Sequence, residues 1–232
     1  MPIAEAVILI LIAPAAALLT ARTKTGYIGN NGDNGDNGEK KPKFGEFVKQ
    51  EKLYIAVMSA VNIIVSVLLI ISANTGKRLY PWSAAEFALL WDLFAGCAYI
   101  DLRVKKIPND LLLYAFLVRT AGIAAELFLS ERPADEIIFF SVIGGASGAI
   151  IILLCRFFSR GGVGMGDVKS YALAGYYFGF AGLINIMFYS LFSAAIVAIF
   201  ILVTKRGKKG STLAMGPFIL LGITLYLTFS II

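Results

Sequence analysis

The sequence of 232 residues contains no histidine and only two cysteines. Without histidine, Ser-His-Asp triads, other histidine-based acid–base catalysis and most zinc chemistry are excluded. Cys97 and Cys155 lie far apart in apolar segments, so they predict neither a disulfide framework nor a zinc cluster, and we interpret both as small buried packing residues. Acid–base chemistry would therefore depend on Asp, Glu, Lys, Tyr or Cys, and we expect no metal and no other cofactor.

Charged residues are also scarce. They make up 16% of the chain, while 58% is hydrophobic; an average soluble domain has about 25% charged residues. The apolar residues form runs of about 20, the length of a membrane-spanning helix. We predict an all-α membrane protein, a helix bundle of about eight transmembrane helices in the lipid bilayer. The expected spans are 3–21, 53–73, 83–101, 111–129, 136–158, 167–178, 181–204 and 213–231, with a tight turn within 179–182.

The polar segments divide the chain into a first transmembrane helix (1–21), a loop (22–52) and a membrane-embedded part (53–232). The loop contains an Asn-Gly-Asp repeat at 29–39 and has no cysteine. Glycine and asparagine at this density favour a flexible loop, and the spacing of its oxygen ligands does not fit a calcium loop.

The net charge of +6 could suggest a nucleic-acid partner, but the basic residues are dispersed among the connecting segments. Such a distribution is better explained by orientation in the membrane, because lysine and arginine accumulate in cytoplasmic loops. Nearly all of them lie in the first, third, fifth and seventh connections, which predicts that these loops are cytoplasmic and that both termini are outside. We expect no nucleic-acid partner; the pattern does not indicate an oligomeric state. The exceptions are Lys77, Arg78, Arg119 and Arg132.

A glycine-rich turn, 161–166, leads directly into Asp167 and a long apolar run. A charged group at the mouth of a membrane helix is costly and suggests a function. From Asp167 to Gly179 a helix rises roughly 18 Å, less than the hydrocarbon core of about 30 Å, which would place the turn below the membrane surface. Irregular backbone at that depth must be buried in protein or line a water-filled cavity. We therefore expect a wet pocket open to the cytoplasm.

Asp101 ends the span at 83–101 and belongs to the same predicted side of the membrane as Asp167. Two carboxyl groups in one pocket can share a proton, so that one activates water as a base and the other acts as an acid. A helix N-terminus stabilises negative charge and a C-terminus does not, which favours Asp167 as the base and Asp101 as the protonated partner. Pro108 ends the connection after Asp101, and Asn109 is a plausible cap for the next helix.

These residues carry a resemblance. The segment Gly164-Met165-Gly166-Asp167 resembles the GxGD signature of intramembrane aspartyl proteases. Together with Lys169, the upstream stretch from Asp101 to Pro108-Asn109, and a Gly-Pro-Phe sequence near the last span, it is similar to the type IV prepilin peptidases in particular. The residues that carry the resemblance are Asp101, Pro108, Asn109, Gly164, Gly166, Asp167, Lys169, Gly216 and Pro217.

The resemblance implies an enzyme of the plasma membrane that removes the leader of type IV prepilin or pseudopilin precursors at the cytoplasmic face, with Asp101 and Asp167 as its catalytic aspartates. Many bacterial relatives also methylate the new N-terminus and carry a zinc-binding cysteine tetrad in the loop after the first span. Because residues 22–52 have no cysteine, we expect peptidase activity only, or a much reduced methyltransferase activity.

Two other functions can be compared with the sequence. A presenilin or signal-peptide-peptidase type protease would have Tyr before the first aspartate and Pro-Ala-Leu near the end, whereas this chain has Ile100 and Gly216-Pro217. A transporter or proton pathway could also use buried carboxylates, but it would be expected to show broken helices in two repeated halves. Only one such break is seen, in the glycine-rich turn.

Further charges lie inside the predicted spans. Asp92 is about 14 Å along its helix from Asp101, too far to be its catalytic partner, and we expect it to form a structural ion pair with Arg119. Glu86 is expected to be near the outer end and in contact with water. We interpret Lys169 mainly as a determinant of topology. The small and aromatic positions of the short span are expected to serve helix packing: Tyr171, Gly175, Tyr176 and Gly179.

Overall fold

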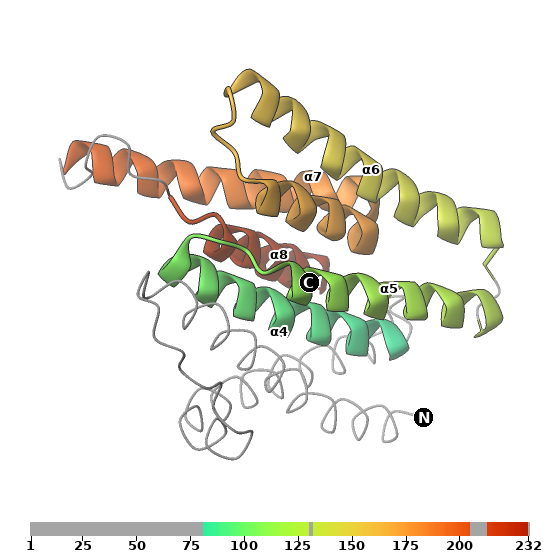
Figure 1. The fold of residues 1–232 in the computed structure, drawn as a ribbon. Coiled ribbons are helices and arrows are strands. Elements are labelled where there is room, and N and C mark those ends of the chain that lie inside the picture. The colour runs from blue at the N-terminus through green and yellow to red at the C-terminus, as the bar shows by residue number, and fades with distance from the viewer. Residues whose placement is uncertain (1–80, 130–131, 205–212, 232) are drawn as a thin grey trace, which may run out of the picture.

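The computed structural model describes residues 81–129, 132–204 and 213–231 (Figure 1). The predicted spans at 3–21 and 53–73, and the loop at 22–52, lie outside these residues. Within them every regular element is a helix, as predicted, and each of the six remaining predicted spans coincides with a helical segment. The helices are α4 (Pro81–Val104), α5 (Asn109–Leu129), α6 (Ala134–Phe158), α7 (Met165–Val203) and α8 (Gly216–Ile231).

Three of the described helices, α5, α6 and α7, are long and apolar enough to cross a membrane. Helix α8 is apolar but shorter. Helix α4, which carries Glu86 and Asp92, is not among the three, because carboxylates lower its hydropathy. Its polar side chains are instead buried inside the bundle. The outer surface of α6 and α7 is apolar, as contact with lipid requires, and exposes Phe139, Phe157, Phe188, Phe200 and Leu202.

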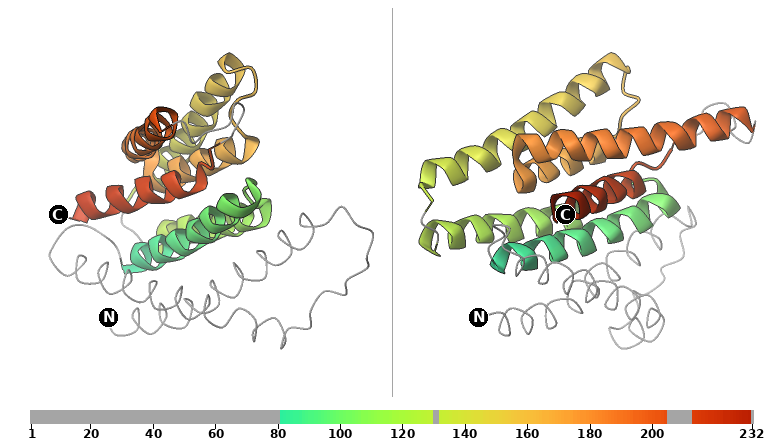
Figure 2. Two further views of the ribbon diagram at one scale, coloured as in Figure 1. Left: turned by 90° about the vertical axis from the view of Figure 1, so that its left-hand side faces the viewer. Right: turned by 180° about the vertical axis from the view of Figure 1, so that it is seen from behind.

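Helix α7 is a hairpin of two antiparallel segments. Its backbone leaves the helical conformation at Gly179 (φ 66°, ψ −174°), a positive φ that favours glycine. The Tyr171 hydroxyl lies 2.6 Å from Ser190 Oγ, 19 residues further along, whereas an uninterrupted helix would separate them by about 28 Å. Figures 1 and 2 show the chain reversing its direction there. The predicted short helical segment and the tight turn after it are confirmed.

Glycines allow α6 and the first segment of α7 to touch through their backbones. A Cβ atom at Gly175 would lie 2.0 Å from the carbonyl oxygen of Gly144, and one at Gly148 would lie 2.4 Å from that of Tyr171. Close approach of this kind is the usual way in which membrane helices associate. The predicted packing role of Gly175 and Tyr171 is thereby confirmed.

Helix α8 packs between α4 and the second segment of α7 (Figure 2). On one side the Trp91 indole donates a hydrogen bond of 2.9 Å to Thr224 Oγ1. On the other, Gly222 faces the Ile186 carbonyl oxygen, to which a Cβ would come within 2.7 Å. The core that joins α4, α5, α7 and α8 includes Leu90, Phe94, Ile100, Leu111, Ile186, Ile219 and Ile223.

The predicted ion pair between Asp92 and Arg119 is wrong. Arg119 Nη1 lies 2.8 Å from Glu86 Oε2 and 3.0 Å from Glu126 Oε1. Asp92 is fully buried, and its carboxylate oxygens have no hydrogen-bond partner among the described residues. Glu86 and Asp92 are six residues apart, about 120° around a helix, so one face of α4 cannot present both to Arg119.

Two predictions of exposure are also wrong. Glu86, expected to contact water, is 6% exposed. It fits against Gly122, where a Cβ would overlap Glu86 Oε1. Cys97 is buried as expected, but Cys155 is exposed on the outer face of α6, because a membrane protein presents apolar side chains to lipid as well as to its core.

Candidate active site

Asp101 occupies the last turn of α4. The helix ends when Lys105 adopts a left-handed conformation (φ 54°), with its N–H still bonded to the Asp101 carbonyl oxygen at 2.8 Å. The Asp101 side chain is only 5% exposed. Its Oδ2 accepts a hydrogen bond of 2.7 Å from the backbone N–H of Gly216. A carboxyl group is thus fixed at the end of the helix by a residue 115 positions away.

Gly216 is the first residue of α8 and allows the helix to begin directly on Asp101. A Cβ at this position would lie 3.0 Å from both Ala98 Cα and Asp101 Cβ. Pro217 follows in the first turn, where the missing N–H removes no helical hydrogen bond. The Gly216-Pro217 sequence therefore allows α8 to begin with its N-terminus directed at the Asp101 carboxyl group.

Asp167 lies in the first turn of α7, directly after the glycine-rich turn. Its Oδ2 accepts a hydrogen bond of 3.1 Å from the backbone N–H of Gly164, and the side chain is half-buried. Asp167 directly follows Gly166, which lies against Ile107, six residues after Asp101. The two predicted aspartates thus lie at the same end of the bundle.

Two contacts connect the segment after Asp101 to the start of α7. A Cβ at Gly166 would lie 2.9 Å from Ile107 Cβ, so the absence of a side chain lets the turn between α4 and α5 pack on the glycine-rich turn. Lys169 Nζ donates a hydrogen bond of 2.8 Å to Asn109 Oδ1. Asn109 was expected to cap α5; it is the first residue of that helix, and its side chain holds Lys169. Pro108, just before it, is buried.

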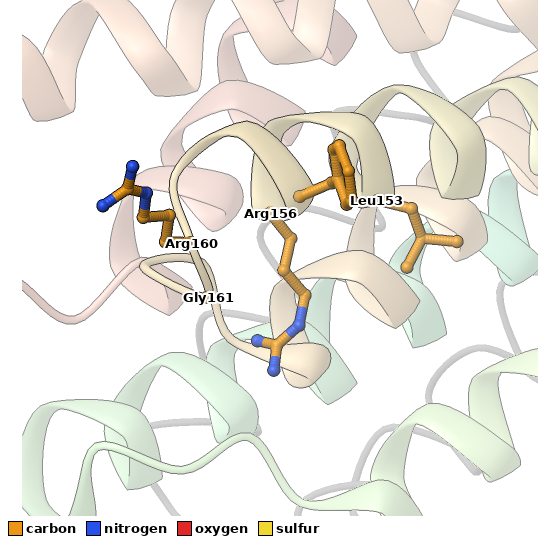
Figure 3. A pocket seen from close by; sticks show the side chains of 5 residues that line it. Leu153, Arg156, Arg160 and Gly161 are labelled. Atoms are coloured by element: carbon orange, nitrogen blue, oxygen red, sulfur yellow. The ribbon is translucent and has the colours of Figure 1, made fainter.

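One hollow in the described part of the molecule has neither aspartate in its lining. It has a volume of about 430 Å³ and lies at the C-terminal end of α6, lined by Leu153, Arg156, Phe157, Arg160 and Gly161 (Figure 3). Among the described residues no three His, Cys, Asp or Glu side chains gather as metal ligands would. Each of the two aspartates is a carboxyl group held at a helix end, and the chemistry that such groups can supply is acid–base chemistry.

Residues 87–199 match the type IV leader peptidase family. This segment, just under half of the chain, is similar to the type IV leader peptidases. The matched range includes Asp101, Asn109, Asp167 and Lys169 and ends before Gly216. Among curated proteins, the prepilin leader peptidase/N-methyltransferase of Bacillus subtilis (strain 168) is 28% identical over 153 residues. That match covers 62% of this chain and 59% of the Bacillus protein, so the chain spans less than two thirds of its relative. No solved structure matches the chain significantly.

Two features of the candidate site could not be predicted from its motifs alone. One is the hydrogen bond between Lys169 and Asn109, since we interpreted Lys169 as a determinant of topology. The other is the effect of α8 on Asp101. The dipole argument considered only the helix to which each aspartate belongs, whereas Asp101 also meets the N-terminus of α8. Both carboxyl groups therefore accept a backbone N–H at a helix N-terminus.

Proposed function

We propose that this protein is an intramembrane aspartic endopeptidase that removes the leader peptide of type IV prepilin or pseudopilin precursors. The observation that supports the proposal is that the segments carrying Asp101 and Asp167 pack together at one end of the bundle. Each carboxyl group is oriented by a backbone N–H, from Gly216 and Gly164 respectively. Such orientation is what a pair of groups needs if both are to reach one substrate bond.

In the proposed reaction the two carboxyl groups begin with one proton between them. The ionised carboxylate takes a proton from water as the water oxygen attacks the scissile carbonyl carbon. The protonated carboxyl group donates its proton to the carbonyl oxygen. Collapse of the tetrahedral intermediate breaks the C–N bond: the leaving amine takes the proton that the base removed from water, and a hydroxyl group of the intermediate returns its proton to the other carboxylate. That Asp167 is the initial base remains a prediction, since a helix N-terminus faces each carboxyl group.

The proposed side of the membrane follows from charge. The end of the bundle that carries the aspartates also carries most of the basic residues of the described chain. Cytoplasmic connections are enriched in lysine and arginine, so we place the site at the cytoplasmic face of the plasma membrane, with both termini outside. The basic residues at this end are Lys105, Lys106, Arg156, Arg160 and Lys169.

Leader removal without methylation is the outcome that we expect from the wild-type protein. The experiment is co-expression with a candidate prepilin in a host without a prepilin peptidase of its own. Cleavage is read as a shift on a gel, and the new N-terminus is identified by mass spectrometry. We expect an unmodified N-terminus, because residues 22–52 have no cysteine to bind zinc. An uncleaved precursor would refute the proposed peptidase activity. A methylated product would refute only the expectation that the new N-terminus stays unmodified.

Gly216→Ala tests the contact between α8 and Asp101. The new Cβ would meet Ala98 and Asp101 at 3.0 Å, so either α8 or the carboxyl group must shift by a few tenths of an ångström. We expect cleavage to fall about 10-fold or more, since small displacements of catalytic groups have large effects. Leu221→Ala, on the exposed face of the same helix, is the control and should retain cleavage. Equal rates for Gly216→Ala and the wild type would show that this contact does not position Asp101.

A further inference from the structure

The hollow at the end of α6 combines apolar walls with positive charge. Leu153 and Phe157 supply apolar surface, and Arg156 and Arg160 complete the lining, with their guanidinium groups extending in different directions (Figure 3). Its volume of about 430 Å³ is in the range of small-ligand sites. Phe157 and the neighbouring Phe158 are each 78% exposed, as expected of side chains that face lipid. A molecule that fits this site must be both apolar and anionic.

No acidic residue opposes this charge from the same part of the chain, because residues 137–166 contain neither Asp nor Glu. The Arg156 guanidinium donates a hydrogen bond to the Val163 carbonyl oxygen. Arg160 extends in a different direction from Arg156 (Figure 3), because the backbone is left-handed at Arg160 (φ 51°) and Gly161 (φ 86°). Non-glycine residues rarely adopt this conformation. Here the left-handed backbone directs the Arg160 guanidinium outward, at the edge of an apolar surface.

We propose that this hollow binds an anionic phospholipid, with an acyl chain against Leu153 and Phe157 and the phosphate at Arg160. Basic pockets beside membrane helices bind anionic headgroups by charge, while an adjoining apolar wall accepts the chain. A zwitterionic lipid also has a phosphate, but its ammonium group would be repelled by the guanidinium groups, so a lipid with net negative charge is favoured. A basic leader peptide would be repelled by both arginines.

The site is connected to the aspartates through the glycine-rich turn. Arg156 lines the hollow and also holds Val163, four residues before Asp167. A lipid in the hollow therefore lies beside Arg156, the residue that holds the segment preceding this carboxyl group. The lipid site itself does not depend on the proposed peptidase activity, since binding can be measured without cleavage.

The experiment is native mass spectrometry of the full chain in detergent after addition of phosphatidylglycerol or phosphatidylcholine with the same acyl chains. We expect more bound phosphatidylglycerol than phosphatidylcholine, and about fivefold less phosphatidylglycerol on Arg160→Gln. Arg160→Lys, which keeps the charge, should retain most of the binding. The matched control is Arg132→Gln, which removes the same charge just before the opposite end of α6 and should bind like the wild type.

Several results would overturn the proposal. Equal binding of the two lipids would show that charge does not select the ligand. Undiminished binding to Arg160→Gln, or an equal loss in Arg132→Gln, would place the lipid elsewhere. Displacement of phosphatidylglycerol by soluble glycerol phosphate would show a site for a free phosphate, because the acyl chain would then contribute nothing. Thermal unfolding of each variant, compared with that of the wild type, identifies losses that are due to misfolding, and Arg160→Lys then supplies the decisive comparison.

Discussion

Replacing either Asp101 or Asp167 with asparagine is expected to lower the rate of leader cleavage by about 100- to 10,000-fold, the usual contribution of a general acid or base. Asparagine keeps the shape of the side chain and can still accept the backbone N–H of Gly216 or Gly164. It cannot exchange a proton with water or with the scissile carbonyl. The loss should therefore reflect chemistry and not a collapse of the helix ends.

The measurement is the initial rate of leader removal from a prepilin in membranes that contain equal amounts of each variant. Asp135→Asn, an exposed carboxylate in the first turn of α6, is the matched control and should cleave at the wild-type rate. The double variant should be little slower than either single variant, because groups that act as a unit are not additive. Near-normal cleavage by Asp101→Asn would end the two-aspartate mechanism, whatever Asp167→Asn does.

The same variants address the transporter alternative. A proton or solute pathway that uses buried carboxylates would also lose activity in Asp101→Asn. The difference lies in the wild-type protein, which should cleave the prepilin after purification and reconstitution. Solute uptake by the wild type without any cleavage of the prepilin would favour the transporter.

The helices could be predicted closely from the sequence because their limits depend on local features. Pro108 and Pro133 stand just before α5 and α6, and the apolar runs between these limits have the length of a membrane span. The hairpin in α7 was predictable for the same reason. A positive φ at Gly179 is accessible to glycine at little cost, and the segment before it is too short to cross the membrane.

The partners of the buried charges could not be predicted, because they depend on how each helix is rotated in the bundle. The apolar spans offered Arg119 three carboxylates: Glu86, Asp92 and Glu126. The choice of Glu86 depends on Gly122, which leaves the space that its carboxylate occupies. A glycine can occur in an apolar span for many reasons. The role of Gly122 in making room for Glu86 could therefore be recognised only from the structure.

The candidate site was predictable in its residues but not in its contacts. The motifs indicated Asp101, Asp167 and Gly216, yet they contained no distance between them. That Gly216 contacts Asp101 follows from the packing of α8 against α4, across 115 positions of sequence. This contact also explains why an argument from the helix of each aspartate alone does not decide which of them is the base.

Arg119→Met is expected to lower the free energy of unfolding by about 3 to 5 kcal/mol, since it leaves buried carboxylates without their cation. Arg119 is 5% exposed and joins four helices. It bonds Glu86 of α4 at 2.8 Å and Ser141 of α6 at 3.3 Å, and its Cζ lies 5.9 Å from the ring centre of Tyr177 in α7. Reversible unfolding by sodium dodecyl sulfate in mixed micelles measures the change.

Asp92→Asn distinguishes this network from the ion pair that the sequence suggested. Because no described residue bonds the Asp92 carboxylate, its neutral and nearly isosteric replacement should leave stability unchanged or raise it. Glu86→Gln should instead be destabilising, since Arg119 would lose a charged partner at 2.8 Å. If Asp92→Asn cost as much stability as Glu86→Gln, Arg119 would be shared with Asp92 and the rotation of α4 would have to differ. The double variant, Arg119→Met with Glu86→Gln, tests the source of the lost stability. If it is more stable than Arg119→Met alone, the lower free energy of unfolding arises from the unpaired Glu86 carboxylate, because a glutamine needs no cation.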